Sequence, residues 1–214
     1  RGRSPSGPRG DFVAQVDDTV GRLLRELDER GLSDDTLFVF TSDNGAHWLP
    51  SEVESTGHAA NGPWRGMKSD AFEGGHRVPF VARWPGRIRA GTTSRAVIGL
   101  QDVFATIADV LERPLPPGTA EDSLSFLPAL RGKAVRRTTP LVLHSARGAF
   151  VLRDGPWKWI DASDSGGWTE AKFETAGQLY HLGRDPGETH NLADTQPDKV
   201  RALRAKLEKL REIR

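Results

Sequence analysis

The sequence contains no cysteine. Disulfides, thiolate metal sites and cysteine nucleophiles are therefore excluded from these 214 residues. An excess of either charge is also lacking, because 30 basic and 29 acidic residues leave a formal net charge of +1. Composition thus offers no electrostatic case for nucleic acid or an anionic membrane as the main partner. No apolar run approaches the length of a membrane span, so none is expected.

What is present is typical of a folded globular chain, with 36% hydrophobic and 28% charged residues. Residues 1–10 are rich in glycine, proline and arginine and predict an irregular lead-in. From Phe12 to Leu27 apolar residues recur at spacings of three and four, which predicts an amphipathic helix that ends at Gly31. The continuous apolar run over residues 36–41 then predicts a buried strand, as in the αβ half of a parallel βαβ unit.

Further along the chain, residues 78–84 predict a second strand and residues 103–111 a second amphipathic helix. After about residue 132 the pattern changes to short strands with turns between them, which indicates a small antiparallel sheet. These strands are expected at residues 141–146, 149–153, 157–160 and 178–182. A closing helix is marked by Val200, Leu203, Leu207, Leu210 and Ile213.

Together these patterns predict an α/β fold with helices packed on a mainly parallel sheet, followed by a small antiparallel sheet and its closing helix. We expect residues 1–132 to form the end of an α/β domain. Residues 133–214 should form a small C-terminal α+β subdomain.

Asp43-Asn44-Gly45 follows the predicted buried strand, at the end where open α/β sheets bind ligands. The carboxylate and the amide oxygen are hard ligands that suit Ca²⁺ or Mg²⁺. The same three residues are also typical of a plain turn. Two protein ligands do not complete a calcium site, so a metal reading requires others from elsewhere.

The segment from Gly66 to Phe80 places Lys68 and Arg77 on either side of a Gly-Gly pair. Glycine lets backbone approach a ligand closely, and the two cations suit sulfate or phosphate oxygens. The alternative is a solvated lysine and an arginine paired with Glu73.

Three histidines, His47, His58 and His76, fall in the same region. They suggest a zinc or proton-transfer site, but none has the short helical spacing of a metal-binding pair. Trp48 and Trp64 either wall a pocket or belong to the core.

Read in order, short motifs along the chain resemble the arylsulfatases of the alkaline-phosphatase-like superfamily. The resemblance extends over essentially the whole chain and is carried by the order of the motifs. The motifs are Asp11-Phe-Val-Ala-Gln-Val-Asp17-Asp18, Leu37-Phe-Val-Phe-Thr-Ser-Asp43-Asn44-Gly45, Gly66-Met-Lys68, Glu73-Gly-Gly-His-Arg77-Val-Pro, Trp84-Pro-Gly86, Leu179-Tyr180 and Asp185-Pro-Gly-Glu188-Thr-His-Asn191-Leu.

The resemblance implies an alkaline-phosphatase-like fold and the hydrolysis of sulfate esters by a formylglycine nucleophile assisted by Ca²⁺. It implies that Asp43 and Asn44 are calcium ligands and that Lys68 contacts the sulfate group. A cation and a metal directed at sulfate oxygens would stabilise developing charge. Further candidates for the substrate side are His58, Asn61, Arg65, His76 and His144. The expected substrate is a sulfated small molecule or glycan, and the expected location is periplasmic or secreted.

One departure from the family pattern concerns the nucleophile, which is made from a Cys/Ser-x-Pro-x-Arg motif. The chain has no cysteine, and its segment Ser4-Pro5-Ser6-Gly7-Pro8-Arg9 is out of register with that motif. The chain therefore resembles the C-terminal portion of an arylsulfatase. We expect this portion to be inactive alone and to require the N-terminal half of the same enzyme as its partner.

Two alternatives remain open at this point. The chain is either a non-catalytic remnant or binding module, or it belongs to a metal-dependent phosphodiesterase or phosphonate hydrolase of the same superfamily. Those relatives often have histidine after the strand-end aspartate, which suits zinc or manganese. Asn44 favours calcium instead.

Overall fold

The structure is a computed structural model and describes residues 2–212. It begins with helix α1 (Gly7–Glu29), followed by the 3₁₀ turn η1 (Ser33–Asp35) and strand β1 (Phe38–Thr41). The helix begins at Gly7, within the segment of residues 1–10 that was expected to be irregular. Pro8 is compatible with this start, because it occupies a first-turn position where proline is favoured. Gly31 adopts φ +66° just after the helix, so the predicted stop is confirmed.

The long segment after β1 contains two short helices that the sequence pattern did not indicate, α2 (Pro50–Thr56) and α3 (Glu73–His76). Strand β2 (Phe80–Arg83) follows and pairs with β1 in an antiparallel ladder. Parallel pairing was expected here, and every ladder between the strands of residues 2–212 is in fact antiparallel. The apolar run of β1 indicates burial on both faces but cannot reveal the direction of the neighbouring strand.

The second half of the chain follows the predicted order more closely. Two helices come first, α4 (Asp102–Val110) and α5 (Leu127–Leu130). A four-stranded antiparallel sheet follows, as predicted, and its strand order is β3-β4-β5-β6. Its strands are β3 (Leu141–His144), β4 (Phe150–Asp154), β5 (Trp157–Ile160) and β6 (Gln178–His181).

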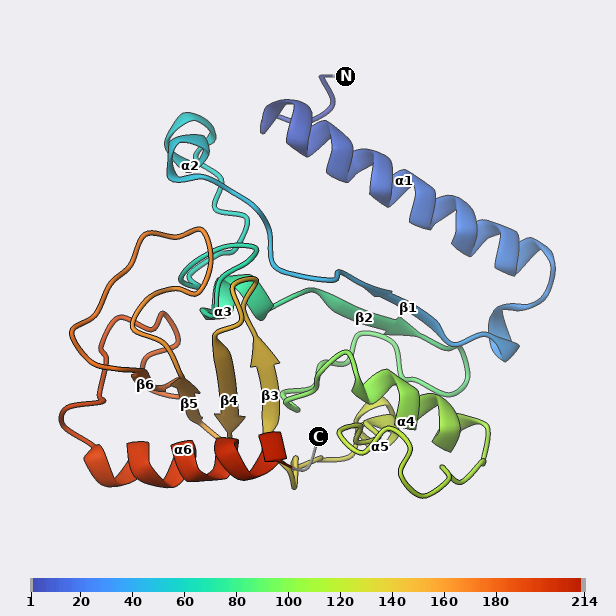
Figure 1. The fold of residues 1–214 in the computed structure, drawn as a ribbon. Helices are drawn as coiled ribbons and strands as arrows, with labels where there is room; N and C mark the ends of the chain where they lie inside the picture. The colour runs from blue at the N-terminus through green and yellow to red at the C-terminus, as the bar shows by residue number, and fades with distance from the viewer. Residues whose placement is uncertain (1, 213–214) are drawn as a thin grey trace.

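One face of this sheet is covered by the closing helix α6 (Pro197–Glu212), which crosses the strands in Figure 1. Leu203 and Leu207 of α6 pack against Leu152, Trp159 and other apolar side chains of that face. Burying each such side chain contributes about 1.5–3 kcal/mol. The closing helix is thus confirmed, although Ile213 of its predicted apolar pattern lies outside the described residues.

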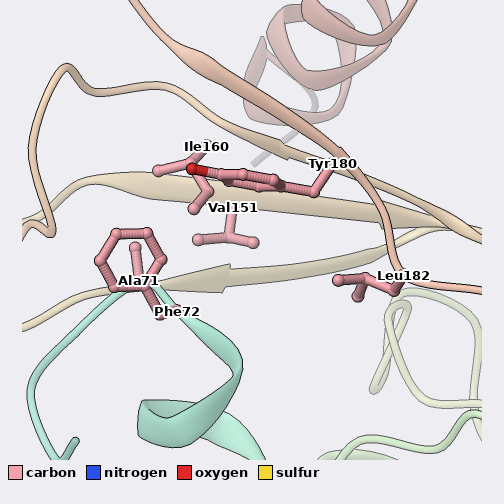
Figure 2. Close-up of a cluster of buried hydrophobic side chains, with 6 residues drawn as sticks. All are labelled: Ala71, Phe72, Val151, Ile160, Tyr180 and Leu182. Carbon is pink, nitrogen blue, oxygen red and sulfur yellow. The ribbon is translucent and has the colours of Figure 1, made fainter. Parts of the chain in front are cut away.

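The opposite face of the sheet packs on the segment that leads into α3. Figure 2 shows Phe72, from that segment, beneath Val151, Ile160 and Tyr180, which come from β4, β5 and β6. All four side chains are fully buried. Because strand side chains alternate between faces, Lys158 points to the same side as Ile160. The sheet therefore fixes the position of the chain around α3, where the candidate site lies.

Helix α1 lies apart from the C-terminal sheet in Figure 1, and none of its residues is buried. Arg9 ties its beginning to the loop after β1 by a bond to the His47 carbonyl oxygen (2.7 Å), and Asp28 ties its end to Arg83 (2.9 Å). The apolar face of the helix is left open, with Phe12 68% exposed. Within the part of the chain that the structure describes, no helix is both long enough and apolar enough to cross a membrane.

Candidate active site

A cleft of about 1000 Å³ lies between the end of β1, the segment around α3 and the C-terminal sheet. Five of the residues proposed from the sequence line it, and other polar side chains join them. The proposed residues are Asp43, Asn44, Lys68, His76 and His144. The other lining residues include the polar Ser69, Asp70, Glu73, Arg77, Ser145, Arg153 and Lys158, and the apolar Phe80, Leu141, Leu143, Val151 and Trp168.

The Asp43-Asn44-Gly45 turn and the Lys68 segment are held together by backbone hydrogen bonds. The Gly45 N–H donates to the Gly75 carbonyl (2.9 Å), and the Lys68 N–H donates to the Ala46 carbonyl (3.1 Å). A Cβ atom on Gly45 would lie 1.7 Å from the Gly74 carbonyl oxygen. Glycine is therefore required at position 45 for the contact of two backbones.

Asp43 and Asn44 present oxygen atoms at the cleft. Asp43 is exposed, and its carboxylate accepts a long hydrogen bond from the Ser42 hydroxyl (3.4 Å). The Asn44 amide nitrogen donates to the Gly45 carbonyl oxygen (3.0 Å), which leaves the amide oxygen as a ligand. These hard donors fit Ca²⁺. The described residues contain no group of three His, Cys, Asp or Glu side chains that could hold a metal ion, so other ligands would be needed.

Lys68 is exposed in the same cleft, next to a residue with unusual backbone geometry. Ser69 has φ +87°, a left-handed conformation that is uncommon for residues other than glycine. Its hydroxyl is buried and has no hydrogen-bond partner among residues 2–212. Such local strain persists only where surrounding contacts impose it, and it is frequent at functional sites.

A buried charge cluster lies behind the cleft. Lys158 of β5 is 0% exposed, and its Nζ is 3.0 Å from Glu73 Oε1 and 2.7 Å from Glu188 Oε1. The Glu73 N–H donates to Glu188 Oε2 (2.6 Å). Arg77 Nε also binds Glu73 Oε2 (2.6 Å), which is the pairing that the sequence offered as the alternative to anion binding by this arginine. The cluster joins α3 to the C-terminal sheet.

The cluster shifts the acidity of its carboxyl groups in opposite directions. Burial alone would raise the pKa of Glu73, but Lys158 and Arg77 outweigh it and lower the pKa to about 2. For Glu188 burial dominates the attraction of Lys158, so its pKa is raised. Unequal pKa values are expected when two carboxyl groups share one cation in a dry site.

His76 lines the cleft, and its Nε2 is buried with no hydrogen-bond partner in the part of the chain that the structure describes. Burial and, next, the nearby Lys158 lower the pKa of His76 to about 4. Its imidazole is therefore neutral near pH 7 and offers a dipole rather than a positive charge. His144 is exposed at the end of β3, where its Nδ1 is 3.0 Å from the Ser145 carbonyl oxygen.

Three residues proposed for the substrate side lie away from the lining of the cleft. Asn61 binds backbone, accepting from the Ala46 N–H (2.9 Å) and donating to two carbonyl groups. Arg65 donates to the Glu188 carbonyl (2.9 Å) and stacks over Phe72. His58 is exposed, with its ring edge-to-face against Trp48 at 5.3 Å. The geometry assigns Asn61 and Arg65 to holding the loop.

Sequence reasoning did not find Asp70, Lys158 or Trp168. Asp70 and Lys158 are charged residues whose importance lies in their burial, at 1% and 0% exposure. No local pattern marks them, because their partners are far along the chain. The one available signal was the Asp185-Pro-Gly-Glu188 motif, whose glutamate is the partner of Lys158.

Comparison with known proteins identifies the class and then the family. The fold is that of the alkaline-phosphatase-like hydrolases. A structure solved in connection with glycosaminoglycan metabolism by Bacteroides thetaiotaomicron superposes with a TM-score of 0.86 at 34% identity, covering 98% of this chain and 45% of that chain. A phosphonate monoester hydrolase of Agrobacterium radiobacter has a TM-score of 0.60 at 26% identity, over 94% of this chain and 40% of that one. The expected fold class is thereby confirmed.

The chain belongs to the sulfatase family. The family model described as Sulfatase matches residues 5–112. An N-acetylgalactosamine-6-O-sulfatase of Bacteroides thetaiotaomicron is 34% identical over 98% of this chain and 43% of its own length. Human steryl-sulfatase is 40% identical over 67% of this chain and 25% of its own length. The chain thus spans less than half the length of the curated relatives it matches.

Proposed function

We propose that this chain supplies one wall of the active site of a calcium-dependent sulfuric ester hydrolase. In this proposal Asp43 and Asn44 bind Ca²⁺, and Lys68 binds the sulfate group of the substrate. The observation that carries it is the joint position of these residues in one cleft, fixed by backbone bonds from Gly45 and Lys68. Membership of the sulfatase family supports it.

The chemistry of the three side chains is consistent with this role. Sulfate oxygens gain negative charge as the ester bond breaks, and a lysine ammonium placed at them stabilises that charge. A calcium ion at Asp43 and Asn44 would supply Lewis acidity to the same oxygens. Lys68 is exposed toward the cleft, so its amine remains available to an anion.

The nucleophile is proposed to come from sequence outside these residues. The chain contains no cysteine, and no Ser-x-Pro-x-Arg motif occurs in it. Only two oxygen ligands for calcium are contributed by the Asp43-Asn44 turn. We therefore expect the chain alone to be inactive toward sulfate esters and to act together with an N-terminal half like that of the relatives.

The proposed substrate is a sulfated sugar. The relative that aligns with 98% of the chain is described as an N-acetylgalactosamine-6-O-sulfatase, whereas the steryl-sulfatase match covers 67%. The cleft also contains exposed polar side chains that could meet sugar hydroxyls, among them Ser94, Arg95 and His144.

A chimera tests the activity directly. This chain would replace the aligned segment of the Bacteroides sulfatase, and turnover of a sulfate ester would be compared with turnover of a phosphonate monoester. We expect sulfate hydrolysis and bound calcium in the chimera, with no hydrolysis by the 214-residue chain alone.

The same experiment distinguishes the sulfatase from a phosphonate hydrolase and from a non-catalytic binding module. Preferred hydrolysis of the phosphonate, together with bound zinc and no calcium, would favour the phosphonate hydrolase. A folded chimera that hydrolyses neither ester would favour a non-catalytic binding module. Turnover of a sulfate ester by the chain alone would contradict the proposed need for a second half.

A further inference from the structure

Trp168 is a large aromatic side chain exposed on the wall of the cleft. It is 51% exposed, whereas Trp84 and Trp159 are 8% and 3% exposed. It lines the same cleft as Asp43 and Lys68. We propose that the Trp168 indole is the platform on which the sugar ring of the substrate stacks while its sulfate group is bound at Lys68. This inference rests on the proposed function and assigns a specificity-determining residue to it.

The position of Trp168 is fixed by the carboxylate of Asp70. Trp168 N–H and Thr169 N–H both donate to Asp70 Oδ1, at 2.7 and 3.0 Å. The Thr169 hydroxyl and the Met67 N–H bind Oδ2 of the same group, the latter at 2.9 Å. Asp70 is 1% exposed and stands two residues after Lys68. One buried carboxylate therefore holds both the backbone beside Lys68 and the backbone of Trp168.

The loop that carries Trp168 is pressed tightly against the Lys68 segment. A Cβ atom on Gly167 would lie 2.4 Å from Asp70 Oδ1 and 2.6 Å from the Ser69 carbonyl carbon. The Ala71 N–H donates to the Ser165 carbonyl (2.7 Å). A platform that is ordered before binding loses little conformational entropy when a ligand arrives, which favours affinity.

The ring itself has a neighbour that limits its rotation. The His47 imidazole meets the Trp168 indole edge-to-face, with ring centroids 5.0 Å apart. This contact joins the loop of the C-terminal half to the turn that carries Asp43 and Asn44. Trp168 is thus oriented by groups on both sides of the cleft.

A sugar suits an exposed indole that has polar side chains in the same cleft. A pyranose has a face of C–H groups that an aromatic ring can cover, while its hydroxyl groups remain in contact with polar partners. The cleft that Trp168 lines also contains exposed polar side chains, Ser94, Arg95 and His144, beside its apolar ones.

Binding to the 214-residue chain tests the inference. The probes are N-acetylgalactosamine 6-sulfate, N-acetylgalactosamine and inorganic sulfate, measured by saturation-transfer NMR and calorimetry. Trp168→Ala should weaken both sugars about tenfold, the equivalent of ~1.4 kcal/mol, and leave inorganic sulfate unchanged. Trp168→Phe should retain most of the affinity for the sugars. Phe104→Ala removes an aromatic ring that is 55% exposed outside the cleft and should change nothing.

The outcomes separate this inference from the proposed function. Lys68→Ala should abolish binding of inorganic sulfate. If the wild-type chain binds the unsulfated sugar through Trp168 but does not bind inorganic sulfate, the proposed function is refuted and the platform is not. Equal affinities of wild type and Trp168→Ala for both sugars would overturn the platform. Should Trp168→Ala fail to fold, a 5-fluorotryptophan label gives a second readout. The ¹⁹F signal assigned to position 168 should shift with sugar, and an unchanged signal would overturn the inference.

Discussion

At the residue scale, Lys158 joins two halves of the molecule. Its ammonium is buried between the carboxylates of Glu73 and Glu188, at 3.0 and 2.7 Å. Glu73 begins α3, whereas Glu188 follows the last strand. Because α3 carries His76 and contacts the Gly45 turn, the ion pairs of Lys158 also help to position His76 and the Asp43-Asn44-Gly45 turn in the cleft.

Replacing Lys158 by methionine tests this role. The substitution would leave two buried carboxyl groups without their common cation, and we expect a loss of about 3–5 kcal/mol in the free energy of unfolding. Lys206 is a matched control, because it pairs with Asp154 at 2.6 Å on the surface. Lys206→Met should cost less than about 1 kcal/mol in chemical denaturation. Similar losses for the two variants would contradict the account.

The pH dependence of stability gives a second test at this scale. The pKa of Glu73 is lowered to about 2 from an ordinary value of 4.5, because Lys158 and Arg77 outweigh the effect of burial. A lowered pKa stabilises the fold above the ordinary value, and this contribution disappears as pH falls from 4.5 to about 2. The difference in unfolding free energy between wild type and Glu73→Gln should therefore shrink through that window.

Guanidinium denaturation of both proteins at several pH values measures this difference. The raised pKa of Glu188 changes the pH dependence of stability with the opposite sign. Because Glu188 is present in both proteins, the comparison isolates the effect of Glu73. A difference that stays constant from neutral pH down to the lowest value studied would show that Glu73 does not titrate as described.

At the element scale, the strand-end turn depends on the absence of a side chain at Gly45. Gly45→Ala would place a methyl group 1.7 Å from the Gly74 carbonyl oxygen, so the backbone must move. We expect a loss of about 1–3 kcal/mol in unfolding free energy. Gly21→Ala in α1 is the control, because its nearest atom is a flexible arginine end at 3.5 Å. It should gain about 0.5–1 kcal/mol. A Gly45→Ala protein as stable as wild type would contradict the described packing.

Most elements could be predicted from the sequence, because their apolar periodicity is local. The amphipathic patterns of α1, α4 and α6 and the short strands of the C-terminal sheet all lie close to their expected positions. The relative direction of β1 and β2 was harder to predict, because it depends on the long segment between them, which has no periodic apolar pattern. The short helices α2 and α3 have too few residues to show a periodic pattern.

The candidate site was only partly predictable for a similar reason. Asp43, Asn44 and Lys68 were found through the order of the motifs, and they do line one cleft. Asp70 and Trp168 could not be found, because their bond joins residues 98 positions apart. Asn61 and Arg65 were proposed as substrate contacts, yet their side chains hold backbone carbonyl groups within the fold.

At the scale of the whole molecule, the exposed face of α1 indicates a surface that is normally covered. Phe12, Val13 and Leu23 are 68%, 66% and 51% exposed, and no residue of the helix is buried. Exposed apolar stripes of this kind mark interaction sites or promote association. The proposed second half of the enzyme is the expected cover.

Sedimentation of the isolated chain tests this reading. We expect self-association that increases with concentration and decreases in a Phe12→Glu, Leu23→Glu variant. Gln15→Glu, which adds a charge to the same helix without removing an apolar group, should have little effect. A monodisperse monomer over the whole concentration series would instead favour a chain that is complete by itself.

The most direct test of the central claim is the activity of the Lys68→Ala chimera. The account places the Lys68 ammonium at the sulfate group, in the cleft that Asp43 and Asn44 also line. Removing a group that stabilises transition-state charge lowers turnover by about 100-fold or more. The chimera carrying Lys68→Ala should lose sulfate ester hydrolysis to this extent and remain folded, whereas Lys209→Ala on α6 should keep full activity. Equal rates for the Lys68→Ala and unsubstituted chimeras would contradict the proposed site.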